Sequence, residues 1–244
     1  MNFPNVFLTV IVPVFNEEQR VEIAVPRLFQ YLEQEFGKWE VLYIDDGSTD
    51  NTYQLLSRIQ QEHPGLRVIR SKKNLGKGNA IRLGLQEAKG DFVMFSDADF
   101  STPIEETGKL LDALHKNHDI AIGSRGLKAS NIEVRQSWAR ENMGKMFNRI
   151  IRAILPLKIS DTQCGFKMFR KESLLIILPR MQMNGFAFDV EMLMIGQIHG
   201  MRIAEIPVTW RNAKGSKVHP IRSSIQMLKD VIAIRRRMTH GEYN

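Results

Sequence analysis

The sequence has little cysteine and no long uninterrupted hydrophobic segment. Cys164 is the single cysteine in 244 residues, so no intramolecular disulfide can form and nothing indicates an oxidising compartment. The longest stretch without Asp, Glu, Lys or Arg runs from Met1 to Asn16 and contains Pro4 and Pro13. It lacks the roughly 18 apolar residues of a spanning helix and the basic start of a signal peptide. We therefore expect a cytoplasmic protein, for which peripheral contact with the cytoplasmic face of a membrane stays open.

Several common ligand-binding signatures are missing as well. The chain contains neither GxxxxGK[ST] nor GxGxxG, which disfavours kinase-like and dehydrogenase functions. Its six His residues and one Cys are not spaced as zinc ligands are. The excess of 34 Lys and Arg over 27 Asp and Glu, a net charge of +7, indicates an anionic partner. RNA binding would require exposed aromatic residues among the basic ones. The basic residues here instead concentrate beside the motifs described below, so we expect a partner other than nucleic acid.

Short apolar segments alternate with helical segments from Phe7 to about Gly123, which predicts βαβ units on a mostly parallel α/β sheet. The helical spacing of apolar residues gives each helix one core face, and Pro26 is expected in a first turn. The predicted strands are Leu8–Val14, Glu40–Ile44, Arg67–Arg70, Asp91–Phe95 and Asp119–Ile122, and the helices are Pro26–Phe36, Thr52–Glu62, Asn79–Ala88 and Ile104–His115.

The alternation of strands and helices stops after Arg125. No repeat, low-complexity tract or long linker separates the two parts, so we expect one domain over residues 1–244, with halves at about 7–125 and 126–238. The predicted elements of the second half are a polar loop (Gly126–Ser137), a helix (Trp138–Leu155), a strand (Phe166–Phe169), a helix (Ala187–His199), a strand (Ile203–Trp210) and a last helix (Ile221–Met238).

Polar clusters follow four of the predicted strands, at Pro13–Glu17, Asp45–Ser48, Asn74–Gly78 and Ser96–Asp99. Taken alone, each can be a turn; Ser48 or Thr49, for example, can cap the next helix. The carboxyl ends of parallel strands meet at one edge of a sheet, where ligands bind. Four such clusters therefore predict a binding site at that edge.

Two of these clusters suggest phosphate chemistry. Asp97 and Asp99 leave an apolar strand with one residue between them, so both carboxylates can reach one cation. Such oxygen ligands suit Mg²⁺ or Mn²⁺ shared with substrate phosphates; the alternative is a pair of solvated loop carboxylates. The glycines of Gly76-Lys77-Gly78 let backbone N–H groups approach an anion, to which Lys77 adds its charge.

These motifs resemble those of the GT-A glycosyltransferases of family 2, namely Val12–Glu17, Asp45–Ser48, Asn74–Gly78 and Asp97–Asp99. Three later motifs look like the dolichyl-phosphate β-glucosyltransferase branch, which is related to the dolichyl-phosphate mannose synthases; they are Asp161–Lys167, Phe188–Glu191 and Gly215–Lys217. The resemblance covers about residues 7–238. The mannose synthases carry Gln where this chain has Ser101, which favours the glucosyl branch and leaves a third metal ligand open.

The resemblance implies a GT-A fold and an inverting, metal-dependent transfer of glucose from UDP-glucose to a polyprenyl (dolichyl-type) phosphate. GDP-mannose-dependent mannosyl transfer and a non-catalytic nucleotide-sugar-binding module are the alternatives. The implied nucleotide-sugar site comprises Pro13, Asn16, Glu17, Asp45, Asp46, Gly76, Lys77, Asp97, Ala98 and Asp189, with Asp97 and Asp99 as metal ligands. The implied acceptor-phosphate site comprises Arg125, Arg140, Arg211 and Lys217. An exposed basic loop is the alternative for Arg211 and Lys217.

The acceptor determines which residues count as catalytic. A phosphate monoester is largely dianionic at neutral pH and needs no base, unlike a sugar hydroxyl. Asp99, Arg125 and Glu191 are the candidate catalytic residues. One of Asp189 and Glu191 is expected to bind donor-sugar hydroxyls, with a base role or helix packing and capping as alternatives.

Two basic amphipathic segments raise the question of membrane contact. Apolar residues alternate with basic ones around Met146–Leu155 and Ile225–Ile232. Such helices can lie in a bilayer interface, or they can pack one face on the protein core.

Overall fold

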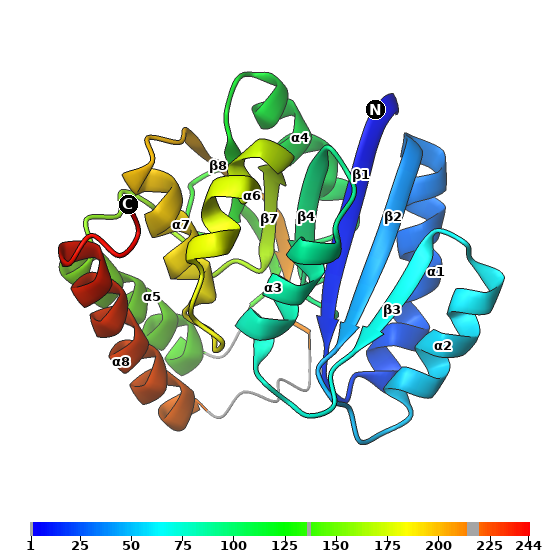
Figure 1. Ribbon diagram of the computed structural model, residues 1–244, viewed down its shortest axis with the longest axis horizontal. Helices are drawn as coiled ribbons and strands as arrows, with labels where there is room; N and C mark the ends of the chain where they lie inside the picture. Colours follow the sequence, from blue (N-terminus) through cyan, green and yellow to red (C-terminus); the bar gives the residue numbers. More distant parts are fainter. Residues whose placement is uncertain (1, 136–137, 214–219) are drawn as a thin grey trace.

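The computed structural model describes residues 2–135, 138–213 and 220–244, and only the backbone of residues 138–140, 142, 145 and 220–223. Seven strands form one sheet in the order β3-β2-β1-β4-β7-β5-β8 (Figure 1). They are β1 (Phe3–Val14), β2 (Phe36–Asp45), β3 (Leu66–Arg70), β4 (Phe92–Ser96), β5 (Ile120–Ser124), β7 (Phe166–Arg170) and β8 (Ile203–Pro207). All neighbours pair in parallel except β7, which is antiparallel to β4 and β5. The predicted mostly parallel α/β sheet is confirmed.

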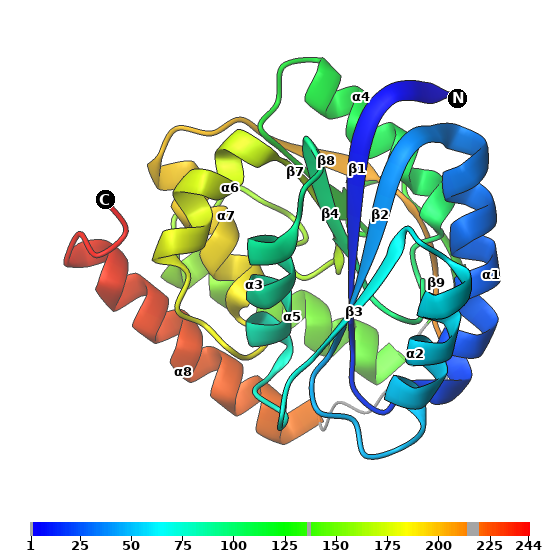
Figure 2. The same ribbon diagram turned by 45° about the vertical axis from the view of Figure 1, so that its right-hand side comes forward.

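Helices cover both faces of the sheet (Figures 1 and 2). One face carries α1 (Glu18–Glu35), α2 (Thr52–Glu62), the 3-10 turn η1 (Ile104–Glu106) and α4 (Thr107–His115), and the other carries α3 (Lys77–Glu87), α5 (Trp138–Ile154), α6 (Lys171–Ile177), η2 (Leu178–Arg180), α7 (Phe188–Ile198) and α8 (Pro220–Thr239). Side chains alternate along β1, so Ile11 packs into one core while Val10 and Val12 pack into the other.

Pro26 lies inside α1 rather than in its first turn, which corrects the prediction. The helix begins at Glu18 and buries Val21 and Val25 before it reaches the proline. An interior proline costs about 3 kcal/mol, whereas burying a valine side chain contributes about 1.5–3 kcal/mol. The burial of these two valines therefore offsets the cost of the proline inside the helix.

The second half contains two elements that the prediction missed. Helix α6 was not expected, and β6 (Asn131–Val134) lies within the predicted loop. β6 pairs in parallel with β9 (Thr209–Arg211) in a separate two-stranded sheet. The single strand predicted over Ile203–Trp210 is therefore wrong: β8 ends at Pro207, which has no N–H to continue the ladder.

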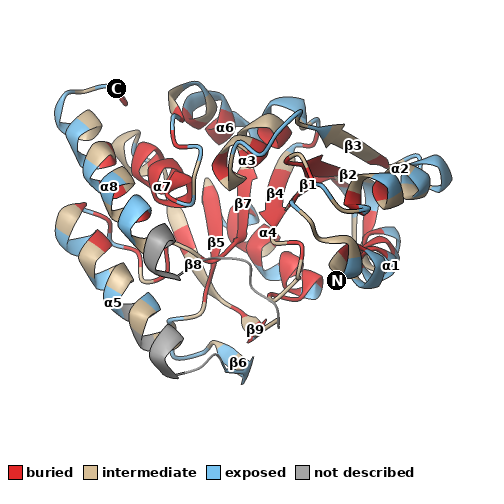
Figure 3. Cartoon of the chain, turned by 90° about the horizontal axis from the view of Figure 1, so that it is seen from below, coloured by how far each residue is buried: buried red, intermediate tan, exposed pale blue. Residues whose placement is uncertain are grey.

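Helices α5 and α8 lie side by side at the outside of the second half (Figures 1 and 2). Each buries part of its apolar stripe, such as Ile151 on α5 and Val231 on α8, and leaves other apolar residues exposed, including Met146, Ile225 and Ile232. Figure 3 shows this division into buried and exposed faces. In the described part of the chain, no helix is long and apolar enough to cross a membrane.

The antiparallel direction of β7 brings a distant segment to the predicted ligand edge. β4 ends at Ser96, which pairs with Phe166 at the start of β7. The residues that precede β7, Asp161–Gly165, therefore lie beside the carboxyl ends of β4 and β5.

Candidate active site

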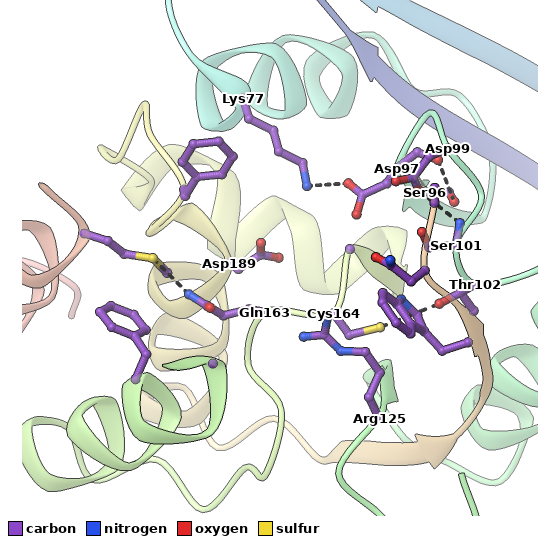
Figure 4. Close-up of a pocket in the computed structure, with 18 of the residues that line it drawn as sticks. Lys77, Ser96, Asp97, Asp99, Ser101, Thr102, Arg125, Gln163, Cys164 and Asp189 are labelled. Atoms are coloured by element: carbon purple, nitrogen blue, oxygen red, sulfur yellow. Dashed lines mark hydrogen bonds and ion pairs between the residues drawn. The ribbon is translucent and has the colours of Figure 1, made fainter. Parts of the chain in front are cut away.

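A cavity of about 340 Å³ opens at the carboxyl ends of β4 and β5. Its polar and charged lining residues come from widely separated segments of the chain and include Lys77, Ser96, Asp97, Asp99, Ser101, Arg125, Gln163 and Asp189 (Figure 4). Its apolar wall includes Met143, Phe147, Phe186, Trp210 and Met227, which come mainly from the second half. Carboxylates, cations and an apolar wall thus share one cavity.

Asp97 and Asp99 both line this cavity, as predicted for a pair of metal ligands. Asp97 Oδ1 lies 2.5 Å from Lys77 Nζ, and Asp99 Oδ1 accepts a hydrogen bond from the backbone N–H of Ser101 (2.9 Å). A side chain at Gly165 would place its Cβ 2.2 Å from Asp97 Oδ2. Gly165 therefore lets the chain pass directly against this carboxylate.

The donor set at Asp97 and Asp99 fits a hard divalent cation. Within the described residues, no group of three or more His, Cys, Asp or Glu side chains is placed to hold a metal. Two carboxylates with a neighbouring cavity match the habit of Mg²⁺ and Mn²⁺ of taking their other oxygens from water and substrate phosphates. Zinc-type nitrogen and sulfur coordination does not match this set.

Lys77 occupies the cavity wall opposite these carboxylates. Burial works against its charge, but the carboxylates of Asp97 and Asp189 outweigh that effect and raise the pKa of Lys77. The ammonium group therefore stays protonated at neutral pH.

Asp189 reaches the cavity from the first turn of α7 and is paired with a lysine inside the protein. Lys167, fully buried in β7, donates to Asp189 Oδ1 (2.5 Å) and to the carbonyl of Cys164 (2.7 Å). Burial raises the pKa of Asp189, while Lys167 and Lys77 oppose the rise. No role was assigned to Lys167 from the sequence, although a lysine between Phe166 and Met168 in an apolar strand was a visible signal.

Arg125 follows the end of β5 and forms a bidentate ion pair with Asp161. Its Nε and Nη2 donate to the two carboxylate oxygens at 2.6 and 2.9 Å, and its backbone N–H donates at 3.0 Å. Although burial alone would raise it, the Arg125 charge and hydrogen bonds lower the pKa of Asp161 to about 2. Asp161 lies within a motif that was noted in the sequence, but its function of fixing Arg125 was not predicted.

The acidic pair at the end of β2, Asp45 and Asp46, lies outside the cavity and organises loops. Asp46 accepts the backbone N–H groups of Leu75 and Gly76 at 2.9 and 2.8 Å, and burial raises its pKa. Asp45 Oδ1 accepts the N–H of Ser48, while its buried Oδ2 lies 3.1 Å from Arg70 Nε and finds no hydrogen-bond partner among the described residues. Asp46 thus shapes the glycine-rich loop that carries Lys77.

The segment after β1 lies at the same edge and is tied to the turn after β2. Asn16 Oδ1 accepts the N–H of Thr49 at 2.7 Å, and Ser48 Oγ accepts the N–H of Asn16 at 2.9 Å. The alternative, in which Ser48 or Thr49 caps the next helix, does not hold, because α2 begins later, at Thr52. Three other predicted nucleotide-site residues, Pro13, Glu17 and Ala98, lie at this edge without lining the cavity.

The structure does not bring Glu191 or Arg211 to the cavity. Glu191 is fully buried and accepts hydrogen bonds from two backbone N–H groups and a tyrosine hydroxyl, so the packing alternative describes it better than a catalytic role. Arg211 is exposed and pairs with Glu133 on the neighbouring strand at 2.5 Å. Lys217 and the side chain of Arg140 lie outside the described residues.

A second cavity of about 420 Å³ adjoins the first and shares Arg125, Gln163 and Trp210 with it. Its lining adds three arginines, Arg135, Arg149 and Arg152, and two carboxylates, Glu141 and Asp161. Asp161 is already paired with Arg125. Positive charge therefore exceeds negative charge among these lining residues.

The chain resembles known proteins over almost its whole length. Residues 9–176 match the glycosyl transferase family 2 domain. The chain is 34% identical to a dolichyl-phosphate β-glucosyltransferase of Dictyostelium discoideum, with coverage of 97% of this chain and 76% of the relative. Proteins of the same name from Saccharomyces cerevisiae (33%; 98% and 77% covered) and Homo sapiens (34%; 98% and 78% covered) are similarly related.

Solved structures share the fold at lower sequence identity. A mannosyl-3-phosphoglycerate synthase from Rubrobacter xylanophilus has a TM-score of 0.72 at 17% identity and covers 97% of this chain and 76% of its own. A glucosyl-3-phosphoglycerate synthase from Mycobacterium tuberculosis, crystallised with Mn²⁺, UDP-glucose and phosphoglyceric acid, has a TM-score of 0.68 at 17% identity, with 95% and 80% covered. These likenesses concern the fold.

Proposed function

Because the chain belongs to glycosyl transferase family 2, we propose that it transfers glucose from UDP-glucose to a dolichyl-type polyprenyl phosphate, with inversion at the sugar carbon. Relatives named dolichyl-phosphate β-glucosyltransferase match more than nine-tenths of the chain at about one-third identity. The observation that carries the proposal is a single cavity in which two carboxylates, Asp97 and Asp99, face two cations, Lys77 and Arg125. A charged donor and a charged acceptor both require such a site.

Donor binding is assigned to the carboxylate side of the cavity. Asp97 and Asp99 would hold Mg²⁺ or Mn²⁺, which when bound neutralises charge on the diphosphate leaving group. Lys77 adds a second positive charge there. Asp189, held by Lys167, accepts hydrogen bonds from donor-sugar hydroxyls.

The nucleoside part of the donor is assigned to the edge formed by β1 and β2. Pro13, Asn16, Glu17 and Asp45 lie at this edge, and Ala98 and Gly76 are sequence neighbours of the cavity residues Asp97 and Lys77. The buried Oδ2 of Asp45 pairs with Arg70 but accepts no hydrogen bond from the described residues, which supports a hydrogen bond from a donor group. Asp46 acts through the loop that it holds.

The acceptor phosphate is assigned to Arg125 and the adjoining arginine-lined cavity. Arginine matches phosphate oxygens with two parallel hydrogen bonds, and Arg135, Arg149 and Arg152 concentrate positive charge next to Arg125. Arg140 and Lys217 are retained as acceptor ligands in this proposal. Since the phosphate dianion is itself the nucleophile, positioning and charge stabilisation are sufficient for transfer.

The acceptor's polyprenyl chain and a peripheral membrane position fit the apolar side of the molecule. Phe147, Phe186 and Met227 form one wall of the cavity. Met146 and Ile225, on the neighbouring helices α5 and α8, are more than half exposed. These exposed residues lie on the same two helices as the cavity residues Phe147 and Met227.

A donor panel tests the proposal. The purified protein is incubated with a short-chain polyprenyl phosphate, Mn²⁺ and either UDP-glucose or GDP-mannose, and products are identified by mass. We expect a hexose adduct from UDP-glucose, and its loss in Asp97→Asn, which removes one charge from an exposed strand end. A product from GDP-mannose alone would establish mannosyl transfer instead. Binding of UDP without any product would indicate a non-catalytic module.

A further inference from the structure

Glu191 is a buried carboxylate that the proposed chemistry does not use. Its Oε2 accepts the backbone N–H groups of Gln182 and Met183 at 2.9 and 2.8 Å, and its Oε1 accepts the hydroxyl of Tyr243 at 2.8 Å. One carboxylate thus joins the loop before α7 to the segment after α8.

The loop that Glu191 holds is seated on the first turn of α3. The carbonyl of Asn184 accepts the N–H of Asn79 at 3.2 Å, and its side chain accepts Arg82 Nη2 at 2.9 Å. Side chains at Gly76 and Gly78 would place Cβ atoms 2.5 Å from the carbonyl oxygens of Asn184 and Met183. The loop and the glycine-rich turn therefore fit together at backbone distance.

Both partners in this contact carry groups of the candidate active site. The glycine-rich turn carries Lys77, which pairs with Asp97, and the loop carries Phe186, which lines the cavity. A change in the position of the loop therefore moves a cation of the donor site and part of the cavity's apolar wall.

The segment after α8 is fastened to the same place. Tyr243 is fully buried, and its carbonyl accepts hydrogen bonds from His199 (2.8 Å) and Arg180 (3.1 Å). Arg237 Nη1 lies 3.9 Å from Glu191 Oε1. His199, directly after α7, and Arg180 of η2 thus hold the backbone of Tyr243, and Arg237 of α8 places a positive charge near the carboxylate.

We propose that Glu191 and Tyr243 are positioning residues for donor binding: they lock the 181–187 loop onto the glycine-rich turn and thereby place Lys77 and Phe186. The proposal rests on the proposed function for the identity of the donor, a uridine diphosphate sugar. It requires neither residue to touch the donor or to transfer a proton.

Calorimetric titration of UDP with Mn²⁺ present tests the proposal on four variants. Tyr243→Phe removes the hydroxyl and keeps the ring. Glu191→Ala removes the carboxylate that accepts hydrogen bonds from the 181–187 loop and from Tyr243. We expect each to weaken UDP binding, by about twofold to thirtyfold, the range for changes that act through a packed network. Glu191→Gln keeps a carbonyl oxygen that accepts the backbone N–H groups and adds an amide N–H that donates to the tyrosine oxygen. We therefore expect near wild-type affinity and kcat.

Tyr31→Phe is the matched control, because this tyrosine lies on α1 and hydrogen-bonds to Thr107. It should leave UDP affinity unchanged. Hydrogen exchange supplies a second readout: amides of 181–187 and of the first turn of α3 should exchange faster in Tyr243→Phe and not in Tyr31→Phe.

The possible outcomes separate the two proposals. Wild-type UDP affinity and exchange in Tyr243→Phe would overturn the positioning role, even if Glu191→Ala fails to fold. Loss of kcat in Glu191→Gln would make Glu191 a base instead. If the wild-type protein does not bind UDP, the proposed function fails. Faster amide exchange at α3 in Tyr243→Phe would still support the role of Tyr243 in holding the 181–187 loop against the glycine-rich turn.

Discussion

At the scale of single residues, the buried charges around the cavity act mainly on one another. Asp161 fixes Arg125, and Lys167 fixes Asp189. A long side chain that is held by two hydrogen bonds has lost its freedom before a ligand arrives, so less entropy is lost on binding. Asp161 and Lys167, which were assigned no role from the sequence, therefore orient Arg125 and Asp189, which were.

Replacing Asp161 by Asn should destabilise the protein in a pH-dependent way. The variant leaves a half-buried Arg125 without its counter-charge, and we expect a loss of about 1–3 kcal/mol of unfolding free energy at pH 7. The pKa of Asp161 is about 2 in the folded protein, below its usual value of about 3.9. Its stabilisation is therefore complete above about pH 4 and is lost as the pH falls through about 2.

Urea unfolding of both proteins between pH 7 and pH 2 measures this effect. The stability difference between wild type and Asp161→Asn should shrink as the pH falls. Asp91→Asn, at an exposed carboxylate, is the control and should change stability by less than about 0.5 kcal/mol. An equal difference at every pH would show that the Asp161 charge contributes nothing to folding.

At the scale of elements, the glycine-rich turn before α3 depends on its backbone conformation. Gly76 has φ 99° and ψ 155°, a region that is essentially restricted to glycine. Asp46 receives the N–H groups of Leu75 and Gly76 on one side, and the 181–187 loop packs on the other. The turn is thus held between residues from both halves of the chain.

Gly76→Ala should therefore destabilise the protein by about 1–3 kcal/mol through backbone strain and should also weaken UDP binding by displacing Lys77. Denaturant unfolding and UDP titration measure the two effects. Gly144→Ala controls the unfolding measurement, because nothing lies within 4 Å of its added Cβ on α5. An alanine there should be neutral or stabilising by up to about 1 kcal/mol. A Gly76→Ala protein as stable as wild type would contradict the strain argument.

At the scale of the whole molecule, β7 joins the two halves into one sheet. It comes from the second half of the chain and lies between β4 and β5 of the first half, with pairing on both sides. The core on one face likewise combines Ile11 and Leu42 with residues of α5, α7 and α8. Neither half retains a complete sheet without the other.

We therefore expect the protein to unfold in a single cooperative transition. Far-ultraviolet circular dichroism and tryptophan fluorescence should give the same midpoint, because Trp39 lies in the first half and Trp210 in the second. Calorimetric and van't Hoff enthalpies should agree. Two separate transitions would show that residues 7–125 and 126–238 are independent domains.

The sequence alone determined the parallel βαβ units and the edge that holds the site. Both depend on local patterns: apolar runs of strand length, amphipathic spacing and polar residues directly after strands such as Asp97 and Asp99. Family motifs added the donor and acceptor classes. The tertiary structure decided what depends on distant neighbours. The antiparallel insertion of β7, the pairing of β6 with β9 and the interior position of Pro26 are stabilised by partners that local sequence does not specify.

The same division applies to the site. A carboxylate at a strand end or on a helix can face a cavity or accept a backbone N–H. The segments that pack around it, which are distant in sequence, determine which of the two it does. Asp97 and Asp189 face the cavity, whereas Asp46 and Glu191, from equally characteristic motifs, hold loops. Residue types fixed the chemistry available to this protein, and packing fixed which of those groups are directed at a ligand, because burial and hydrogen-bond geometry exist only in the folded chain.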